Sequence, residues 1–356
     1  MGWLSDYARS ARLTDRFEER DTVEHIRLIA AGLGGEAGSI LAEFKKEQRE
    51  REAYPHYQHR LVEEFGDFLW YFVRFADLRA PGLTDHLELH DLKGTSASGD
   101  FIEFGARVGR AVGAALENDM DFAQIVADVW TSLCAIAEVA HVELQAAADA
   151  NLRKNQSIWP ELRKPLALFD ADSIEEEQIP RQLTVEFRER KNSPRNVVYL
   201  RCNGINFGDR LTDNIEGEDD GYRFHDIFHF AYAVYLGWSP VVRALLKAKR
   251  KSEPAKDEGQ DGARAIILEE AVSATVFSRG KHMKLFAGAT HVDYDLLKTI
   301  REFVRDLEVA AVPLWQWDEA IIRGFAVFRE LMANRGGTVR LDLIDRTIEY
   351  QVPSDR

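Results

Sequence analysis

The sequence predicts a mainly α-helical protein with two domains, the second of which carries a small antiparallel β-sheet. Apolar residues recur at the helical period of 3.6 residues through most of the first half of the chain. Short alternating runs of polar and apolar residues, typical of β-strands, occur after residue 182 and near the C-terminus. The length of 356 residues is more than twice that of a usual domain of roughly 150 residues, so two domains with separate cores are expected.

Four helices are expected in residues 1–160, which is enough to enclose the core of a helical bundle. The first has an amphipathic pattern that four glycines interrupt, which indicates close packing against a neighbour or a kink. A Tyr-Pro pair marks the loop before the second helix, and residues 83–100 are expected to form a loop. The four expected helices span residues 22–46, 59–78, 101–117 and 122–154.

The second domain is expected at residues 183–356, after an irregular linker at residues 161–182 that includes an acidic run. Two strands with a hairpin-like turn at residues 191–194 open this domain, and a hairpin that turns near residues 345–346 closes it. The strands are expected at residues 183–188, 197–206, 338–344 and 347–352. Helices are expected between them, at residues 222–235, 240–249, 263–277, 293–311 and 314–333.

The composition is that of an ordinary globular protein, with 45% hydrophobic and 30% charged residues. No run approaches the roughly 20 apolar residues that cross a bilayer. The N-terminus also lacks the basic and apolar regions of a secretory signal, so we expect a cytoplasmic protein without membrane contact. The formal net charge of −14 argues against stable binding to nucleic acids. A small anionic substrate is compatible with this charge when divalent cations screen its phosphates.

The sequence contains two cysteines, Cys134 and Cys202, and neither belongs to a CxxC pair. A disulfide framework and a thiolate zinc site are therefore not expected. Any metal ion would be held by carboxylate oxygens or imidazole nitrogens.

Acidic side chains are concentrated on two consecutive expected helices. Glu64 and Asp67 are three residues apart and share one helical face, and Glu36 and Glu43, seven apart, share a face of the preceding helix. If these helices pack antiparallel, the four acids converge, which is costly unless a cation neutralises them. Oxygen ligands without cysteine favour Mg²⁺, with Mn²⁺ as an alternative. Acidic residues on helices usually face solvent, but Glu64 and Asp67 interrupt a strongly apolar stretch, which favours a metal site.

Residues 32–38 read Gly-Leu-Gly-Gly-Glu-Ala-Gly, and residues 63–71 read Glu-Glu-Phe-Gly-Asp-Phe-Leu-Trp-Tyr. With these motifs the chain, over roughly residues 22–160, resembles the MazG-like branch of the all-α NTP pyrophosphohydrolases, whose pattern is Glu-x-x-Glu followed by Glu-x-x-Asp. The resemblance implies that the acids bind Mg²⁺ and that a nucleoside triphosphate is cleaved between its α and β phosphorus atoms to monophosphate and pyrophosphate. It also implies a homodimer or a higher homo-oligomer, because such bundles usually form their sites between subunits.

The family pattern can be transferred residue by residue. Glu36 matches the first acid, Glu64 the third and Asp67 the fourth, and the resemblance implies catalytic and metal-binding roles for these three. Ser39 stands where the second glutamate belongs, so the number of metal ions or the activity differs from the family pattern. Glu43, further along the same face, is a candidate substitute ligand, and the seryl hydroxyl is a candidate partner of a metal-bound water.

Basic and aromatic residues near the acids are candidates for substrate binding. The segment with Lys154 and Asn155 resembles the late basic segment that reaches the triphosphate in the family, and Lys45 and Lys46 at the end of the first helix are further candidates. The alternative is that these basic residues complement helix C-termini. Trp70 could stack on a base, although packing in the core is the expected role of such a residue.

A second cluster lies in the expected C-terminal domain, which resembles the C-terminal extension found on some bacterial MazG-like proteins. His225 and His229 are four residues apart and share a helical face, and Asp226 or Glu270 could complete a metal shell. The pattern is loosely similar to the His-Asp pair of metal phosphohydrolases, and the alternative is a set of polar residues that hydrogen-bond inside a bundle. Residues 270–273 also repeat three of the four positions of residues 36–39, which suggests a duplication.

Three functions are compatible with these patterns. The expected one is Mg²⁺-dependent hydrolysis of a nucleoside triphosphate or a related small nucleotide, for nucleotide-pool cleaning or for nucleotide depletion during stress or phage attack. The first alternative is a nucleotide-sensing protein that hydrolyses its ligand slowly because Ser39 replaces an acid. The second is a metal phosphohydrolase centred on the histidine cluster, with a regulatory first domain.

Overall fold

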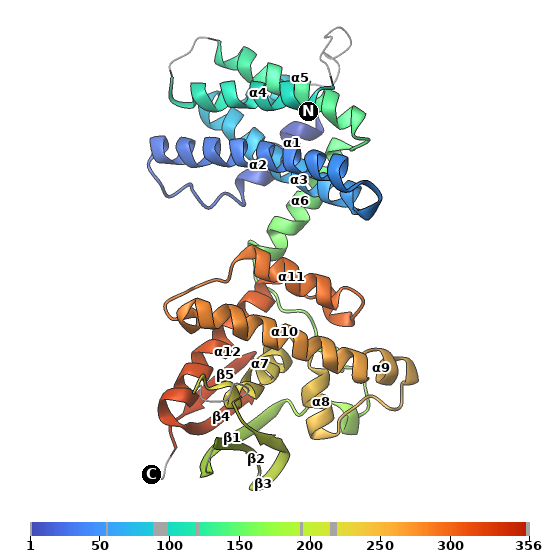
Figure 1. Ribbon diagram of the computed structural model, residues 1–356, viewed down its shortest axis with the longest axis vertical. Coiled ribbons are helices and arrows are strands. Elements are labelled where there is room, and N and C mark those ends of the chain that lie inside the picture. The colour runs from blue at the N-terminus through green and yellow to red at the C-terminus, as the bar shows by residue number, and fades with distance from the viewer. Residues whose placement is uncertain are drawn as a thin grey trace. The chain divides into compact units, whose positions relative to one another are not determined.

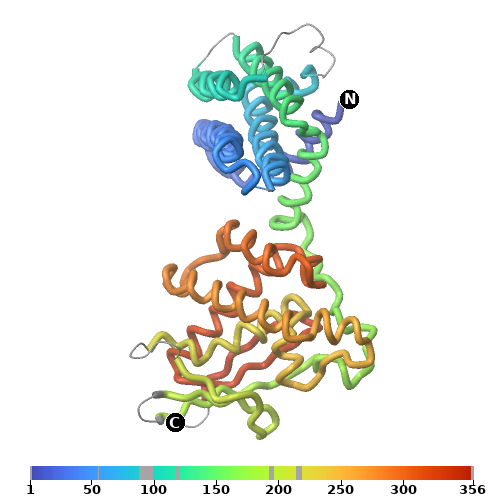
Figure 2. Tube along the Cα trace, turned by 45° about the vertical axis from the view of Figure 1, so that its right-hand side comes forward, coloured from blue at the N-terminus to red at the C-terminus, as the bar shows by residue number. Residues whose placement is uncertain are grey.

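The structure is a computed structural model of the chain. It describes residues 2–54, 56–87, 99–117, 121–192, 195–213 and 219–353. The chain forms two compact units, Met1–Leu162 and Arg163–Arg356 (Figure 1). The described part of the first unit is helical (Figure 2), and one five-stranded antiparallel sheet, labelled in Figure 1, belongs to the second. The predicted fold class, mainly α with a small antiparallel sheet in the C-terminal half, is confirmed.

The first unit is a helical bundle. Its long helices α2 and α3 pack against each other, α6 packs against α3, and α4 packs against α2 and α5. Large aromatic side chains fill the core, among them Phe65, Phe68, Phe72 and Phe104. The helices are α1 (Trp3–Arg12), α2 (Thr22–Glu50), α3 (Tyr57–Arg79), α4 (Phe101–Gly113), α5 (Phe122–Val139) and α6 (Leu144–Ile158).

Three features of the bundle differ from the expected pattern. The helix α1, which was not expected, buries Leu4 and Tyr7 in the core. The helix expected at residues 122–154 is two helices, because His141 adopts a positive φ of 54° and the Glu143 carboxylate caps the N-terminus of α6. Of the loop expected at residues 83–100, residues 88–98 lie outside the described residues, and Leu83–His86 form a 3₁₀ turn.

Two glycines allow helix α3 to approach both of its neighbours closely. A Cβ atom on Gly32 of α2 would lie 2.1 Å from Cε1 of Tyr71, and one on Gly66 of α3 would lie 2.6 Å from the carbonyl oxygen of Ala147 on α6. The helix α2 is continuous across its glycines. The glycine-rich segment was expected to indicate either close packing or a kink, and the structure supports close packing.

The helix α5 is, within the described residues, the one helix that is long and apolar enough to cross a membrane. Core helices of water-soluble proteins meet the same criteria of length and composition. Val126, Trp130 and Leu133 on one face of α5 are buried in the core of the bundle. One face of α5 therefore packs inside the bundle.

The sheet of the second unit joins the two expected hairpins. Its strand order is β3-β2-β1-β4-β5, and all neighbouring strands are antiparallel. The expected second strand is wrong at its end, because Asn203 and Gly204 have φ values of 50° and 79° and form a two-residue turn before a third strand. Residues 193–194 of the expected first turn lie outside the described residues. The strands are β1 (Gln182–Asn192), β2 (Arg195–Cys202), β3 (Ile205–Leu211), β4 (Gly336–Asp342) and β5 (Thr347–Gln351).

Two helices, α7 and α12, pack against each other and contact the strands β4 and β5 (Figure 1). Helix α10 contacts α7, α8 and α11. The helix expected at residues 293–311 ends earlier, at Val304, and a 3₁₀ turn follows at Glu308–Ala311. The helices of this unit are α7 (Asp226–Leu236), α8 (Pro240–Leu246), α9 (Pro254–Gly259), α10 (Ala263–His282), α11 (Tyr294–Val304) and α12 (Leu314–Asn334).

The linker expected at residues 161–182 is wrong for most of its length, because residues from 163 onward belong to the second compact unit. The Asp170 carboxylate is 1% exposed and lies 2.8 Å from guanidinium nitrogens of both Arg181 and Arg243. The Glu177 carboxylate accepts hydrogen bonds from the backbone nitrogen and the hydroxyl of Ser252. Asp170 and Glu177 are therefore held by polar partners within the second unit, whereas Glu175 and Glu176 of the acidic run are exposed.

Candidate functional site

Three carboxylates converge in the first unit. Glu36 lies on α2, and Glu64 and Asp67 lie one turn apart on the adjoining helix α3. One oxygen atom of each can be chosen so that all three lie within 4.8 Å of one another. The i, i+3 spacing on α3 and the close packing of α2 on α3 place these acids together. Oxygen donors at this separation can share one hard divalent cation, such as Mg²⁺ or Mn²⁺.

The electrostatics of this cluster favour a cation. Burial, together with the negative charges of Asp67 and Glu64, raises the pKa of Glu36 to about 7, against the opposing effects of Lys154 and of a hydrogen bond with Ser39. Negative charge in this position is therefore costly for the protein alone. Ser39, which replaces the family's second acid, hydrogen-bonds with Glu36 and so helps to fix its orientation.

Asp67 is oriented by side chains from helix α6. Asn151 donates a hydrogen bond from Nδ2 to Asp67 Oδ1 at 2.7 Å, and the Lys154 ammonium pairs with the same oxygen. The Asn151 amide oxygen in turn accepts hydrogen bonds from the Tyr7 hydroxyl and from Asn155 Nδ2, each at 3.0 Å. Asn151 was not among the predicted site residues, although its position one turn before Lys154 was a usable signal.

Two of the predicted residues lie elsewhere. The Glu43 carboxylate is buried and is held by the Lys46 ammonium and the Tyr54 hydroxyl, which keep its pKa below the ordinary value despite the opposing effect of burial. Its seven-residue separation from Glu36 corresponds to about 10 Å of helical rise, which is too far for a shared ion. The structure therefore does not support Glu43 as a ligand of the carboxylate cluster, and it gives Lys46 a different partner.

The remaining predicted substrate residues of the first unit differ in their exposure. Lys45 is exposed on α2, whereas Lys154 and Asn155 face the carboxylate cluster through their contacts with Asp67 and Asn151. Trp70 is 8% exposed, and its indole nitrogen donates a hydrogen bond to the Thr14 hydroxyl at 2.9 Å. Of the two roles considered for Trp70, the structure supports the one in the core.

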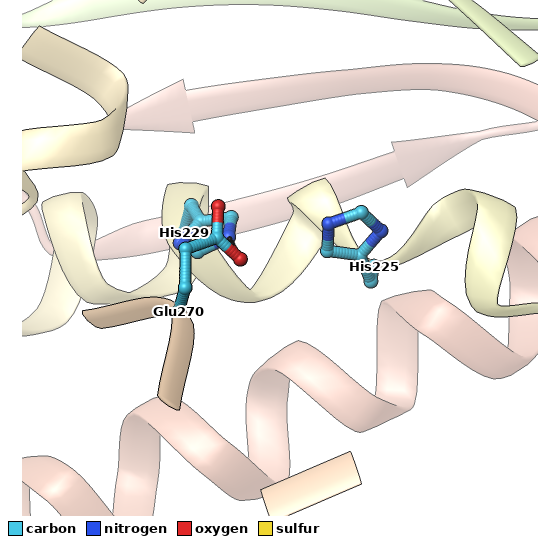
Figure 3. Close-up of side chains that lie close together, drawn as sticks. All are labelled: His225, His229 and Glu270. Carbon is cyan, nitrogen blue, oxygen red and sulfur yellow. Dashed lines mark ion pairs between the residues drawn. The ribbon is translucent and has the colours of Figure 1, made fainter. Parts of the chain in front are cut away.

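A second cluster in the second unit combines imidazole and carboxylate groups. His225 and His229 lie one turn apart at the start of α7, and Glu270 approaches them from α10 (Figure 3). One ligand atom of each of these three residues lies within 4.8 Å of the others. Asp226 is buried next to them, with an oxygen 3.4 Å from His225 Nε2, but it is outside this set of three.

Hydrogen bonds define the orientation of both histidines. The Nδ1 atom of His225 lies 2.8 Å from the Tyr222 carbonyl oxygen, and the Nδ1 atom of His229 lies 2.8 Å from the Glu269 carboxylate. These partners only accept hydrogen bonds, so each Nδ1 carries a proton and donates it. The Nε2 atom of each ring is then the one left for a proton or a metal ion. Glu269 was missed by the sequence analysis, because it precedes the predicted Glu270 and nothing in the pattern tells which of the two faces α7.

The two rings have different pKa values. Burial lowers the pKa of His225 below its ordinary value. Burial also acts to lower the pKa of His229, but the charge of Glu269 and its hydrogen bond raise it to about 10. His229 is fully buried, and its Nε2 atom makes no hydrogen bond within the part of the chain that the structure describes.

The second unit matches a known protein family. A family model described as the MazG C-terminal domain matches residues 164–354, which include all strands and helices of the second unit and the histidine cluster. No curated protein and no solved structure matches the chain. The start of the match at residue 164 agrees closely with the start of the second compact unit at Arg163.

Proposed function

Because the chain belongs to the MazG C-terminal domain family, we propose that it is a nucleotide pyrophosphohydrolase whose first unit hydrolyses nucleoside triphosphates to monophosphate and pyrophosphate. The observation that supports this proposal is the convergence of Glu36, Glu64 and Asp67 on two packed helices. Family membership makes the protein MazG-related, and the carboxylate cluster supplies the chemistry that such hydrolysis needs.

The donor set of the cluster suits Mg²⁺, with Mn²⁺ as an alternative. Glu36, Glu64 and Asp67 offer only oxygen atoms, and the pKa of Glu36 is raised by burial and by the neighbouring negative charges, which a divalent cation would balance. When bound, the ion would screen the substrate phosphates and stabilise negative charge that develops on them. The three acids would hold the ion, and Lys154 would lie beside it to pair with a phosphate oxygen.

The reaction joins a water oxygen to the α phosphorus and breaks the bond from that phosphorus to the oxygen that bridges it to the β phosphorus. Pyrophosphate leaves with the electron pair of this bond. A carboxylate of the cluster accepts the proton of the attacking water, and Glu36, which lies on α2 opposite the two acids of α3, is the proposed base. Ser39 hydrogen-bonds with Glu36 and thereby keeps this carboxylate in one orientation.

The test is pyrophosphate release from a panel of canonical and modified nucleoside triphosphates, with Mg²⁺ or Mn²⁺. The variants are Glu64→Gln in the first cluster and His225→Ala in the second, with Glu47→Gln on α2 as the control for a lost charge. We expect Glu64→Gln to lower release by at least about 100-fold, or about 2.7 kcal/mol, and the other two variants to retain it. Loss of release only in His225→Ala would move the chemistry to the second unit.

A wild-type protein that binds nucleotide with Mg²⁺ but releases no pyrophosphate would contradict the proposal. That outcome would support the nucleotide-sensing alternative, in which Ser39 replaces an acid needed for turnover. We also propose a homodimer or a higher homo-oligomer, as implied by the resemblance of the first unit. Light scattering coupled to gel filtration measures this, and a monomeric mass at assay concentration would contradict it.

A further inference from the structure

The histidine cluster of the second unit takes no part in the proposed hydrolysis. It is built from His225 and His229 on α7 and Glu270 on α10, on separate helices that pack together (Figure 3). We propose that these three residues form a binding site for one divalent transition-metal ion of the Zn²⁺ type, with a coordination position left open for water or an anionic ligand.

The ring nitrogens of both histidines are already oriented by hydrogen bonds. Both Nδ1 atoms donate to acceptors, one to the Tyr222 carbonyl and one to the Glu269 carboxylate. Metal-binding histidines commonly donate one ring N–H to a carbonyl or carboxylate and bind the metal with the other nitrogen. The two rings of this cluster therefore already have the outer hydrogen bonds that a metal site requires.

The Nε2 atom of His229 is buried and makes no hydrogen bond within the described residues. The His229 side chain is 0% exposed. A buried polar atom without a partner is rare, because it loses its hydration without compensation. The Nε2 atom forms an ion pair with Glu270 Oε2 at 3.5 Å, beyond the usual length of a hydrogen bond. Two ligand atoms that are each about 2.1 Å from one ion, at a tetrahedral angle, lie about 3.4 Å apart, so this separation suits a shared metal ion.

The two adjacent glutamates, Glu269 and Glu270, have different roles. Glu269 is fully buried, and its oxygens accept hydrogen bonds from His229, from the Ser239 hydroxyl at 2.6 Å and from the backbone nitrogen of Val241 at 2.8 Å. It is a positioning residue, because these donors already occupy its oxygens. The Glu270 side chain is 44% exposed, so its carboxylate can move and connects the cluster with solvent. An ion can therefore enter past Glu270.

The donor set determines the class of metal. Two imidazoles and one carboxylate suit Zn²⁺, Co²⁺ or Ni²⁺, whereas Mg²⁺ prefers oxygen ligands alone. A set of two histidines and one glutamate is also one in which a protein usually leaves a fourth position for water or substrate.

The test uses the full-length protein, stripped of metal with a chelator and kept in excess Mg²⁺ to occupy the carboxylate cluster of the first unit. Zn²⁺ binding is measured by titration calorimetry, and Co²⁺ binding by its visible absorption, which reports ligand number and geometry. The ligand variants are His225→Ala and Glu270→Gln. His282→Ala, at an exposed histidine on the same helix α10, is the matched control. Circular dichroism verifies that each variant is folded.

We expect one equivalent of Zn²⁺ per chain, with the dissociation constant raised at least about tenfold in His225→Ala and in Glu270→Gln and unchanged in His282→Ala. The Co²⁺ spectrum should change in both ligand variants. Glu64→Gln should leave both measurements unchanged, which separates this site from the proposed hydrolytic one. Absence of stoichiometric binding by the wild type, or equal affinity in the folded Glu270→Gln variant, would overturn the proposal. Either result would leave His229 as a buried imidazolium paired with glutamate.

Discussion

The charge repulsion in the carboxylate cluster gives a test that does not depend on the substrate. Replacing Glu36 with Gln removes one negative charge and keeps the shape of the side chain. The pKa of Glu36 is raised from 4.5 to about 7 by burial and by the charges of Asp67 and Glu64. In the unfolded chain its pKa is near 4.5, so the folded state binds more protons between these two values. The stability of the metal-free protein must therefore fall as the pH rises from about 4.5 to about 7.

The size of the effect follows from the shift. A difference of about 2.5 pKa units corresponds to at most about 3.4 kcal/mol. Because the Glu36 carboxyl is only partly buried, solvent screening reduces this to about 1–2 kcal/mol. Glu36→Gln should therefore stabilise the first unit by about 1–2 kcal/mol at pH 8 in a chelator and by much less at pH 4.5. In excess Mg²⁺ the order should reverse, because the wild type retains a ligand that the variant lacks.

Hydrogen exchange followed by mass spectrometry is the suitable assay, because it reports on α2 and α3 separately from the second unit. Amide exchange of these helices is compared for the wild type, Glu36→Gln and the control Glu47→Gln, which removes a charge elsewhere on α2. Charge repulsion in the cluster is refuted if Glu36→Gln destabilises α2 and α3 in chelator at pH 8. It is also refuted if Glu47→Gln stabilises these helices as much as Glu36→Gln does. If Mg²⁺ slows amide exchange of α2 and α3 equally in Glu36→Gln and in Glu47→Gln, Glu36 is excluded as a ligand.

Three further substitutions test the surroundings of the cluster. Asn151→Ala removes a hydrogen bond to Asp67 and should lower stability by about 1–2 kcal/mol in urea unfolding, together with a severalfold loss of pyrophosphate release. Glu43→Ala removes a buried acceptor and should cost about 1–3 kcal/mol, whereas pyrophosphate release per folded molecule should stay at the wild-type level. Gly32→Ala places a methyl group against the Tyr71 ring and should cost about 1–3 kcal/mol of stability by the same measurement.

The helices of the first unit could be predicted because each buries one apolar face, which appears in the sequence as a period of 3.6 residues. The break between α5 and α6 could not be predicted in this way. The residues at the break contain no glycine or proline, and the chain turns there through the positive φ of His141 and the cap provided by Glu143. Glutamate is not among the residues that usually cap helices, so the residue types at this position do not mark the break.

The pairing of strands that are distant in the sequence could not be predicted from local sequence signals either. Hairpins were predicted from alternation and turn residues, which are local signals. The pairing of β1 with β4 joins Val185 with Val339, more than 150 residues away in the sequence, and it makes one sheet from two expected hairpins. Pairing over such a distance depends on the helices α7 and α12, which contact β4, and no single segment of the sequence encodes it.

The carboxylate cluster could be predicted only in part. The helical repeat shows which residues share a face of a helix, but a shared face does not bring residues together when they lie far apart along the helix axis. Glu64 and Asp67 are one turn apart, so a shared face is sufficient for them to meet. Glu43 shares a face with Glu36, but nearly two turns of helix separate them, and Glu43 is held by Tyr54 instead. The prediction that Glu43 joins the cluster was based on the shared helical face and did not take into account the distance along the helix axis.

The similarity between residues 36–39 and residues 270–273 shows why a motif on one helix does not define a site. In the first unit Glu36 faces carboxylates from α3 and hydrogen-bonds with Ser39. In the second unit Glu270 faces imidazoles from α7, and Ser273 is buried on the same helix α10. The same glutamate and serine thus belong to an oxygen-only cluster in one unit and to a nitrogen-containing cluster in the other. Because the facing helix supplies the remaining donors, it determines which metal each cluster can prefer.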